Sequence, residues 1–190
     1  MNTSPVIKVW DLPLRLFHWL LVAGFFTAYF TEDELLDLHV IAGYLVFGLL
    51  LFRFIWGFSG NQYARFSNFL CPPQQSLAYI KDLINHSAKR YIGHNPAGAA
   101  MIALLLLSLL LTSLTGFAVY GADQAAGPLA AIGAAHEKFW EELHEFFANF
   151  TLLLVIVHII GVVIESWIHR ENLAKAMLHG FKKTPTPPNQ

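Results

Sequence analysis

The chain has 190 residues and a formal net charge of −1; 55% of its residues are hydrophobic and 13% are charged. This balance excludes an ordinary soluble domain and indicates an integral membrane protein. The single cysteine, Cys71, excludes an internal disulfide. It also excludes a cysteine-bound zinc site or an iron–sulfur cluster built by this chain alone.

Four apolar stretches are long enough to cross a bilayer as helices. We predict an all-α fold, a membrane four-helix bundle, with spans at about residues 14–30, 39–58, 97–120 and 143–167. The whole chain, residues 1–190, is predicted to be one membrane domain. Acidic residues follow the first stretch in place of a small-residue cleavage site, so we expect a retained span and not a signal peptide.

Two short interfacial helices are predicted outside the spans. The first begins at Pro72-Pro73, and one of its faces carries Leu77, Ile80, Leu83 and Ile84. That face suits the membrane surface or, equally, a partner's soluble domain. The second follows Trp167 and ends at Gly180, and the PTPPNQ tail after it is expected to be disordered.

The cationic residues are divided unequally between the two sides of the membrane that these spans define. Apart from Lys138, every Lys and Arg lies on the side of the two termini and of the long middle connection. The positive-inside rule therefore predicts cytoplasmic termini in a multi-pass protein of the bacterial inner membrane. The two outward segments are acidic and carry Glu32, Asp33, Glu34, Asp37, Asp123, Glu137, Glu141, Glu142 and Glu145.

Four histidines lie in the predicted spans, at two depths. Because consecutive spans run in opposite directions, His39 and His144 lie near the outer edge, whereas His18 and His158 lie toward the cytoplasmic edge. The fourteen positions between His144 and His158 correspond to about 21 Å along a helix, with the side chains within about 40° of each other. Ionisable groups inside a membrane are costly and mark functional sites.

Two pairs of imidazoles on facing helices match the needs of two six-coordinate b haems, since each iron takes one histidine nitrogen above the ring and one below it. We predict an outer haem bound by His39 and His144 and an inner haem bound by His18 and His158. His169 is a weaker alternative ligand beside His158. The alternative for each histidine taken alone is an interfacial residue that hydrogen-bonds to the backbone or to a lipid headgroup.

Other residues have less specific interpretations. Small residues near the histidines leave room for a porphyrin edge or serve helix packing: Gly24, Gly43, Gly48 and Gly161. Arg15 and Arg53 are candidates to bind haem propionates, with membrane anchoring as the competing role. The remaining histidines are expected in a loop (His136) or on solvated surface segments (His86, His94 and His179). The tryptophans at 10, 19, 56, 140 and 167 fall near predicted span ends, as in an aromatic belt.

Several motifs lie along the chain: VWDLPLRLFHW, HxxxGYLVFGLLLFRFIWGFSG, YARFSNFL, RYIGHNPAGA and HExxxN followed by a downstream histidine. Together they resemble the bacterial cytochrome b561 superfamily, and more narrowly its nickel–iron hydrogenase-type cytochrome b subunit branch. The resemblance extends from about Val6 to Ile168. It implies a four-helix membrane bundle with two b haems and one ligand each from the first and second spans and two from the fourth. On this chain those ligands are His18, His39, His144 and His158.

The resemblance also implies electron exchange between a quinone pool and a redox partner, such as a hydrogenase or a c-type cytochrome. We therefore expect a dihaem b-type cytochrome that serves as an electron-transfer subunit and not as a stand-alone catalyst. Its expected partners are membrane lipid, an exchangeable quinone and that redox protein, with no nucleic acid. Two alternatives are a superoxide oxidase that passes electrons to quinone and a haem-free membrane anchor. The acidic exterior argues against the first, because steering an anion requires positive potential.

The pairing by depth predicts which histidines share a haem. Replacing His39 or His144 by alanine should remove or alter the same outer haem, and replacing His18 or His158 should affect the inner haem, because an iron that loses one axial ligand loses its six-coordinate state. Absorption spectra and redox titrations of the four single variants measure this. A common centre lost in both the His39 and the His158 variants would contradict the pairing.

Overall fold

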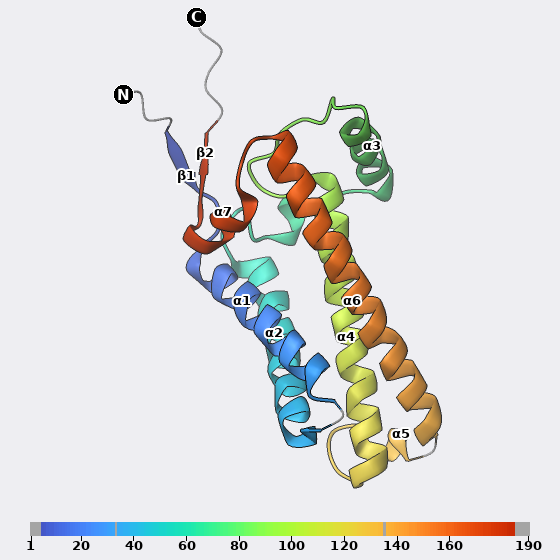
Figure 1. Ribbon diagram of the computed structural model, residues 1–190. Coiled ribbons are helices and arrows are strands. Elements are labelled where there is room, and N and C mark those ends of the chain that lie inside the picture. Colours follow the sequence, from blue (N-terminus) through green and yellow to red (C-terminus); the bar gives the residue numbers. More distant parts are fainter. Residues whose placement is uncertain (1–4, 33, 135, 185–190) are drawn as a thin grey trace, which may run out of the picture. The chain divides into compact units, whose positions relative to one another are not determined.

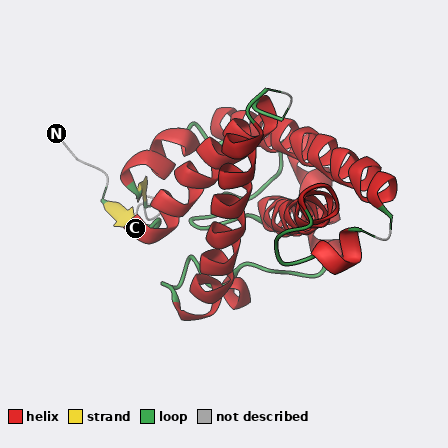
Figure 2. Cartoon of the chain, turned by 90° about the horizontal axis from the view of Figure 1, so that it is seen from below, coloured by secondary structure: helices red, strands yellow, loops and turns green. Residues whose placement is uncertain are grey.

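The computed structural model describes residues 5–32, 34–134 and 136–184. Asp33 of the predicted acidic segment and the tail predicted to be disordered, residues 185–190, lie outside the described residues. The described chain is mostly helical (Figure 2). The predicted helical class is thus confirmed, and the short strands add only a few residues to it.

Within the described residues, four helices are long and apolar enough to cross a membrane (Figure 1). They are α1 (Leu12–Phe30), α2 (Leu36–Ser59), α4 (Pro96–Gln124) and α6 (Glu137–Ile168). α6 begins six residues before the predicted fourth span. The added turns are rich in glutamate, which favours a helix N-terminus because the carboxylates face the positive end of the helix dipole.

The connecting segments contain shorter elements. They are the strands β1 (Val6–Lys8) and β2 (Phe181–Lys183), a 3₁₀ turn (Phe66–Asn68), and the helices α3 (Pro73–Ile84), α5 (Ala130–Gly133) and α7 (Leu173–His179). β1 and β2 pair antiparallel and join the two ends of the described chain. This pair is not predictable from local sequence patterns, because three-residue strands are too short to show alternation.

Side-chain caps and one glycine fix where several helices begin and end. The carboxylate of Asp11 accepts from the backbone N–H of Leu14 at 2.9 Å and caps α1. Asn95 and Asn172 do the same for α4 and α7. Gly180 ends α7 in the left-handed conformation (φ +90°), which confirms its predicted role as the stop.

The chain divides into two compact units. Unit 1 comprises residues 1–17, 54–101 and 158–190, and unit 2 comprises residues 18–53 and 102–157. The apolar core of unit 2 is formed by Phe25, Val46, Leu50 and Leu109. A Cβ at Gly24 would lie 3.2 Å from Val46, so this glycine allows α1 and α2 to approach closely. Of the two roles considered for Gly24, helix packing is the one supported here.

In unit 1 an aromatic cluster corrects two expectations. The imidazole of His94, predicted to be solvated, lies between Trp10 and Phe69 with ring centroids 4.6 and 4.7 Å away. Trp10 is buried in this cluster and is therefore not part of an interfacial aromatic belt. The chain is folded here so that the segment before α1 packs against the segment before α4, a long-range contact that local sequence patterns do not report.

The amphipathic segment of unit 1 forms α3 with the predicted apolar face exposed. Leu77, Ile80 and Ile84 are exposed, whereas Tyr79 on the other face is buried and donates a hydrogen bond to Glu165 of α6 at 2.8 Å. Burial, reinforced by this neighbouring carboxylate, raises the pKa of the Tyr79 hydroxyl. Tyr79 therefore remains a neutral donor and attaches α3 to the end of α6.

A nearly buried group of charges holds β2 in unit 1. Glu171 lies 2.9 Å from Arg90 and 3.5 Å from Lys182, and Lys182 is only 5% exposed. Burial by itself would raise the pKa of Glu171, but Arg90 and Lys182 outweigh it and hold the pKa below its ordinary value. Burial lowers the pKa of Lys182, and Glu171 partly offsets this effect.

Replacing Glu171 by glutamine should lower the free energy of unfolding by about 3 kcal/mol, because it removes the carboxylate that lies against the buried Lys182 and the half-buried Arg90. A carboxyl with a lowered folded-state pKa stabilises the protein above its unfolded-state pKa, and this contribution is lost as the pH falls through the folded-state pKa. The two proteins should therefore converge in stability at acidic pH. Thermal unfolding in detergent between pH 7 and pH 3.5 measures the difference.

The exposed ion pair of Lys138 and Glu142, at 3.9 Å, provides the control. Replacing Glu142 by glutamine should change the stability by less than about 1 kcal/mol, since exposed pairs are screened by solvent. Equal effects of the Glu142 and Glu171 variants would contradict the assignment of the buried network.

Candidate functional site

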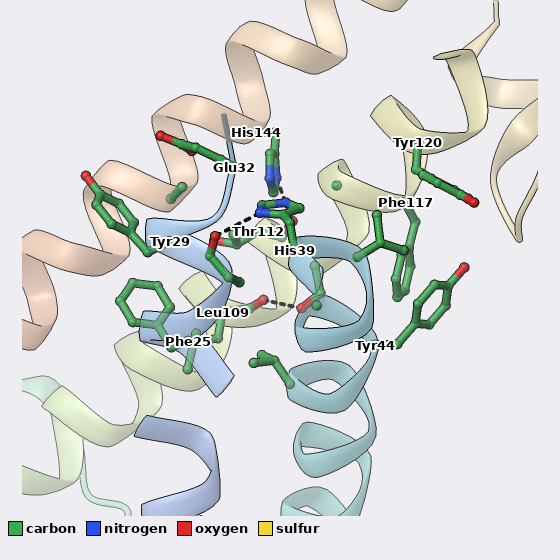
Figure 3. Close-up of a pocket in the computed structure, with 17 residues that line it drawn as sticks. Phe25, Tyr29, Glu32, His39, Tyr44, Leu109, Thr112, Phe117, Tyr120 and His144 are labelled. Carbon is green, nitrogen blue, oxygen red and sulfur yellow. Dashed lines mark hydrogen bonds between the residues drawn. The ribbon is translucent and has the colours of Figure 1, made fainter. Parts of the chain in front are cut away.

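A pocket in unit 2 is lined by residues from all four long helices (Figure 3). Its lining is mostly aromatic or small and includes Phe25, Tyr29, Gly43, Tyr44, Gly116, Phe117 and Tyr120. Two histidines, His39 of α2 and His144 of α6, are the imidazoles in this lining, and Glu32 contributes a carboxylate. An apolar cavity with a few converging polar groups is the usual form of a ligand or cofactor site.

The rings of His39 and His144 lie against each other in this pocket. Their centroids are 6.0 Å apart and their planes are nearly perpendicular, at 88°. His39 lies in the first turn of α2, whereas His144 lies two turns into α6. The sequence placed these two residues at one depth, and the structure brings their side chains together.

Hydrogen bonds to main-chain carbonyls fix the tautomer of both imidazole rings. The Nδ1 of His39 lies 2.8 Å from the carbonyl oxygen of Ala28, and the Nδ1 of His144 lies 3.0 Å from that of Thr112. A carbonyl oxygen only accepts hydrogen bonds, so in each ring Nδ1 carries the proton and donates it. The Nε2 of each neutral ring then has an unprotonated lone pair that can bind a metal.

The two acceptor carbonyls are accessible for different reasons. Ala28 lies in the last turn of α1, where carbonyls lack a full set of helical partners. Thr112 lies in the middle of α4, and its carbonyl has a second lone pair beyond the helical hydrogen bond. Four residues later is Gly116, where an added Cβ would lie 2.9 Å from Cε1 of His144. The missing side chain at Gly116 therefore lets the imidazole reach the carbonyl of Thr112.

This arrangement fits a haem iron. Imidazole nitrogens bind metals at about 2 Å, so two rings on opposite sides of one iron have centroids roughly 6 Å apart. Among the described residues no group of three or more His, Cys, Asp or Glu side chains could hold a metal ion. A pair of imidazoles is the set that a haem needs, because the macrocycle supplies the other four nitrogens.

The glycines near the histidines differ in what surrounds them. Gly43, one turn after His39, lines the pocket, and an added Cβ there would meet no atom within 4 Å. This leaves an open strip of backbone where a flat ring could approach. Gly48 and Gly161 also face open space, but they are not part of the pocket lining. Of the glycines predicted to leave room for a porphyrin edge, Gly43 is thus the one that lines the pocket with the paired histidines.

Sequence reasoning missed the contribution of α4. The predicted third span, residues 97–120, has no histidine and so contributed none of the predicted ligands. In the structure Thr112 supplies the carbonyl for His144, and Thr115 places its hydroxyl 3.2 Å from the same Nδ1. The available signal was the recurrence of hydroxyl residues in an otherwise apolar span, since such groups in a membrane helix need polar partners.

The other predicted ligands are described individually. His18 of α1 is half-buried and its ring lies edge-on to Trp19 at 4.9 Å. His158 of α6 is half-buried and follows His144 on the same helix. His18 and His158 belong to different compact units, and their pairing stays a prediction. His169, the alternative to His158, lies 3.2 Å from the carboxylate of Glu165, which favours a structural role for it.

The two candidate arginines occupy different settings. Arg15 donates a hydrogen bond to the carbonyl of Leu178 in the last turn of α7, where a cation also complements the negative end of the helix. This contact gives Arg15 a structural function within unit 1. Arg53 of α2 belongs to unit 2 and is only 2% exposed, which is unusual for a charged side chain. Propionate binding by Arg15 and Arg53 stays a prediction.

Comparison with known proteins gives a family match over most of the chain. A family described as prokaryotic cytochrome b561 matches residues 9–180. The probable Ni/Fe-hydrogenase B-type cytochrome subunit of Azotobacter vinelandii is 29% identical, over 96% of this chain and 90% of that protein. Its counterpart in Cupriavidus necator is 28% identical, over 92% of this chain and 86% of that protein.

A third relative, the probable Ni/Fe-hydrogenase 1 B-type cytochrome subunit of Escherichia coli, is 27% identical over 92% of this chain and 89% of that protein. No solved structure matches the chain.

The contact between Gly116 and His144 predicts a selective effect on the haem content. Replacing Gly116 by alanine should displace the imidazole and lower the bound haem b by about half, because only the site of His39 and His144 is disturbed. Pyridine haemochrome assays of the purified variant measure the content. Gly48→Ala is the matched control, since its new methyl group would meet no atom within 4 Å. Equal haem content in both variants would contradict the role of Gly116.

Proposed function

The chain belongs to the prokaryotic cytochrome b561 family, and on that premise we propose that it conducts electrons across the membrane through two b haems, between the quinone pool and a redox partner. It is a multi-pass membrane cytochrome that transfers electrons through haem b. We propose in addition that the chain binds two haems through four histidines and exchanges electrons with a quinone and a redox partner.

The paired imidazoles of His39 and His144 are the observation that carries the proposal. In both rings Nδ1–H donates to a main-chain carbonyl and leaves Nε2 to bind a metal, at a ring separation that suits one iron. A bound haem supplies a one-electron couple. His39 and His144 would hold the haem iron, the carbonyls that accept from their Nδ1 atoms would keep both rings in the metal-binding tautomer, and the apolar lining of the pocket would exclude water.

A second haem is proposed at His18 and His158. The support is the repeat of imidazoles on α6, where His158 lies fourteen residues after His144, about 21 Å farther along the helix. A second imidazole on the same face of a membrane span is costly, and binding to a haem iron would offset that cost. With ligands at both depths, α6 is the helix shared by the two sites.

The partner is proposed from the relatives and from charge. The relatives are named as subunits of Ni/Fe hydrogenases, so we propose a hydrogenase as the redox partner and a cationic c-type cytochrome as the alternative. The exposed carboxylates near the pocket, among them Glu34, Asp37 and Glu141, favour a partner with a basic contact surface. By the positive-inside rule this acidic side faces outward from the bacterial inner membrane.

The same carboxylates disfavour superoxide as the substrate. Glu32 lines the pocket that holds His39 and His144, so an incoming anion would meet a negative charge close to the haem. A neutral quinone meets no such barrier and reaches its site from the lipid.

Reduction by quinol and reoxidation by candidate partners test the function directly. The purified cytochrome should contain about two haem b per chain, become reduced when a quinol is added without oxygen, and be reoxidised by an oxidised hydrogenase or a c-type cytochrome. Stopped-flow spectra of the haem bands follow both steps. Purified protein that lacks haem b would refute electron transfer, whereas rapid reduction by superoxide would favour the superoxide oxidase.

A further inference from the structure

Three hydroxyl side chains form a buried cluster between α4 and α6 within unit 2. Thr151 of α6 lies 2.6 Å from Ser108 and 3.1 Å from Thr112, both of α4. Thr151 is 0% exposed and Ser108 is 2% exposed. Polar groups in an apolar interior are unfavourable unless they are hydrogen-bonded, and in membranes such groups join helices where lipid provides no alternative partner.

One assignment of donors and acceptors satisfies all three hydroxyl groups of the cluster. Thr112 donates to the carbonyl oxygen of Ser108 at 2.9 Å, so its hydroxyl oxygen is left to accept from Thr151. Thr151 in turn accepts from Ser108. Each hydroxyl has only one proton, and this order uses all three. Removing the hydroxyl of Thr151 therefore breaks both contacts that cross from α6 to α4 in this cluster.

Thr151 and His144, both of α6, bind the same part of α4. His144 and Thr151 are seven residues apart on α6, which brings them within about 20° of each other on the helix. His144 binds the main-chain carbonyl of Thr112, and Thr151 binds the side chain of the same residue. Two attachments about 10 Å apart along α6 fix both the rotation and the sliding of one helix against the other.

We propose that Thr151 is a positioning residue for His144: through Thr112 and Ser108 it sets the length of the hydrogen bond from Nδ1 of His144 and thereby the reduction potential of the outer haem. The inference rests on the proposed function, since it requires a haem at His39 and His144. A hydrogen bond from Nδ1 to a carbonyl makes the imidazole a stronger donor to iron and stabilises the oxidised state.

The test is a redox titration of the full-length haem-loaded protein and its Thr151→Val variant. The substitution keeps the branched shape of the side chain and replaces the hydroxyl by a methyl group. The outer haem should shift to a more positive midpoint potential and change its low-spin electron paramagnetic resonance signal, whereas the inner haem keeps both. Selective loss of the outer haem would support the proposal in the same way. The His39→Ala and His18→Ala variants identify which redox step belongs to which haem.

Three further variants control the experiment. Thr151→Ser keeps the hydroxyl and should restore the potential of the unchanged protein. Ser108→Ala removes one hydroxyl from the α4 side and should give a smaller positive shift, so the proposal remains testable if Thr151→Val does not fold. Ser59→Ala is the matched control for Ser108→Ala, because the hydroxyl of Ser59 bonds to the carbonyl of Ile55 on its own helix; it should leave the cluster and the outer potential unaltered.

Two results separate the inference from the function on which it rests. If the unchanged protein contains no haem b, the proposed function and the inference both fail. If the unchanged protein contains its haems and both Thr151→Val and Ser108→Ala leave the outer potential and resonance signal unaltered, only the positioning role is overturned. Equal shifts of the two haems would also overturn it, since they would indicate a general loosening of the bundle.

Discussion

The hydrogen bonds from Nδ1 of His39 and His144 to main-chain carbonyls are the constraint on which the rest of unit 2 depends. They fix the neutral tautomer that a metal requires, and they do so without adding a charge to an apolar interior. All four long helices contribute to this one site. α2 and α6 supply the imidazoles, whereas α1 and α4 supply the carbonyls of Ala28 and Thr112.

Helix packing in the absence of a hydrophobic driving force explains the composition of α4. In lipid, helices associate through close contact of small residues and through hydrogen bonds between polar side chains. α4 uses Gly116 for the first and Ser108 and Thr112 for the second. Thr112, whose hydroxyl joins α4 to α6, also binds His144 through its main-chain carbonyl. The same turn of α4 thus stabilises the packing of the two helices and positions the imidazole that would bind the cofactor.

Much of the architecture could be read from local patterns. Apolar runs predicted the four long helices, a glycine predicted the end of α7, and helical periodicity predicted the exposed face of α3. Errors arose where distant segments meet. His94 was expected to be solvated, but it packs between Trp10 and Phe69. The strands β1 and β2 were not predicted, because their pairing joins the two ends of the described chain and leaves no periodic trace.

The sequence by itself determined the membrane class and the long apolar helices and predicted a depth for each histidine, because these follow from hydropathy, helix length and alternating direction. Only the tertiary structure decided that the rings of His39 and His144 lie 6.0 Å apart, that Thr112 and Gly116 accommodate one of them, and that Thr151 binds the same turn of α4. These contacts depend on the rotation of each helix about its own axis. Sequence periodicity fixes which residues share a face, but the neighbouring helix decides what that face touches.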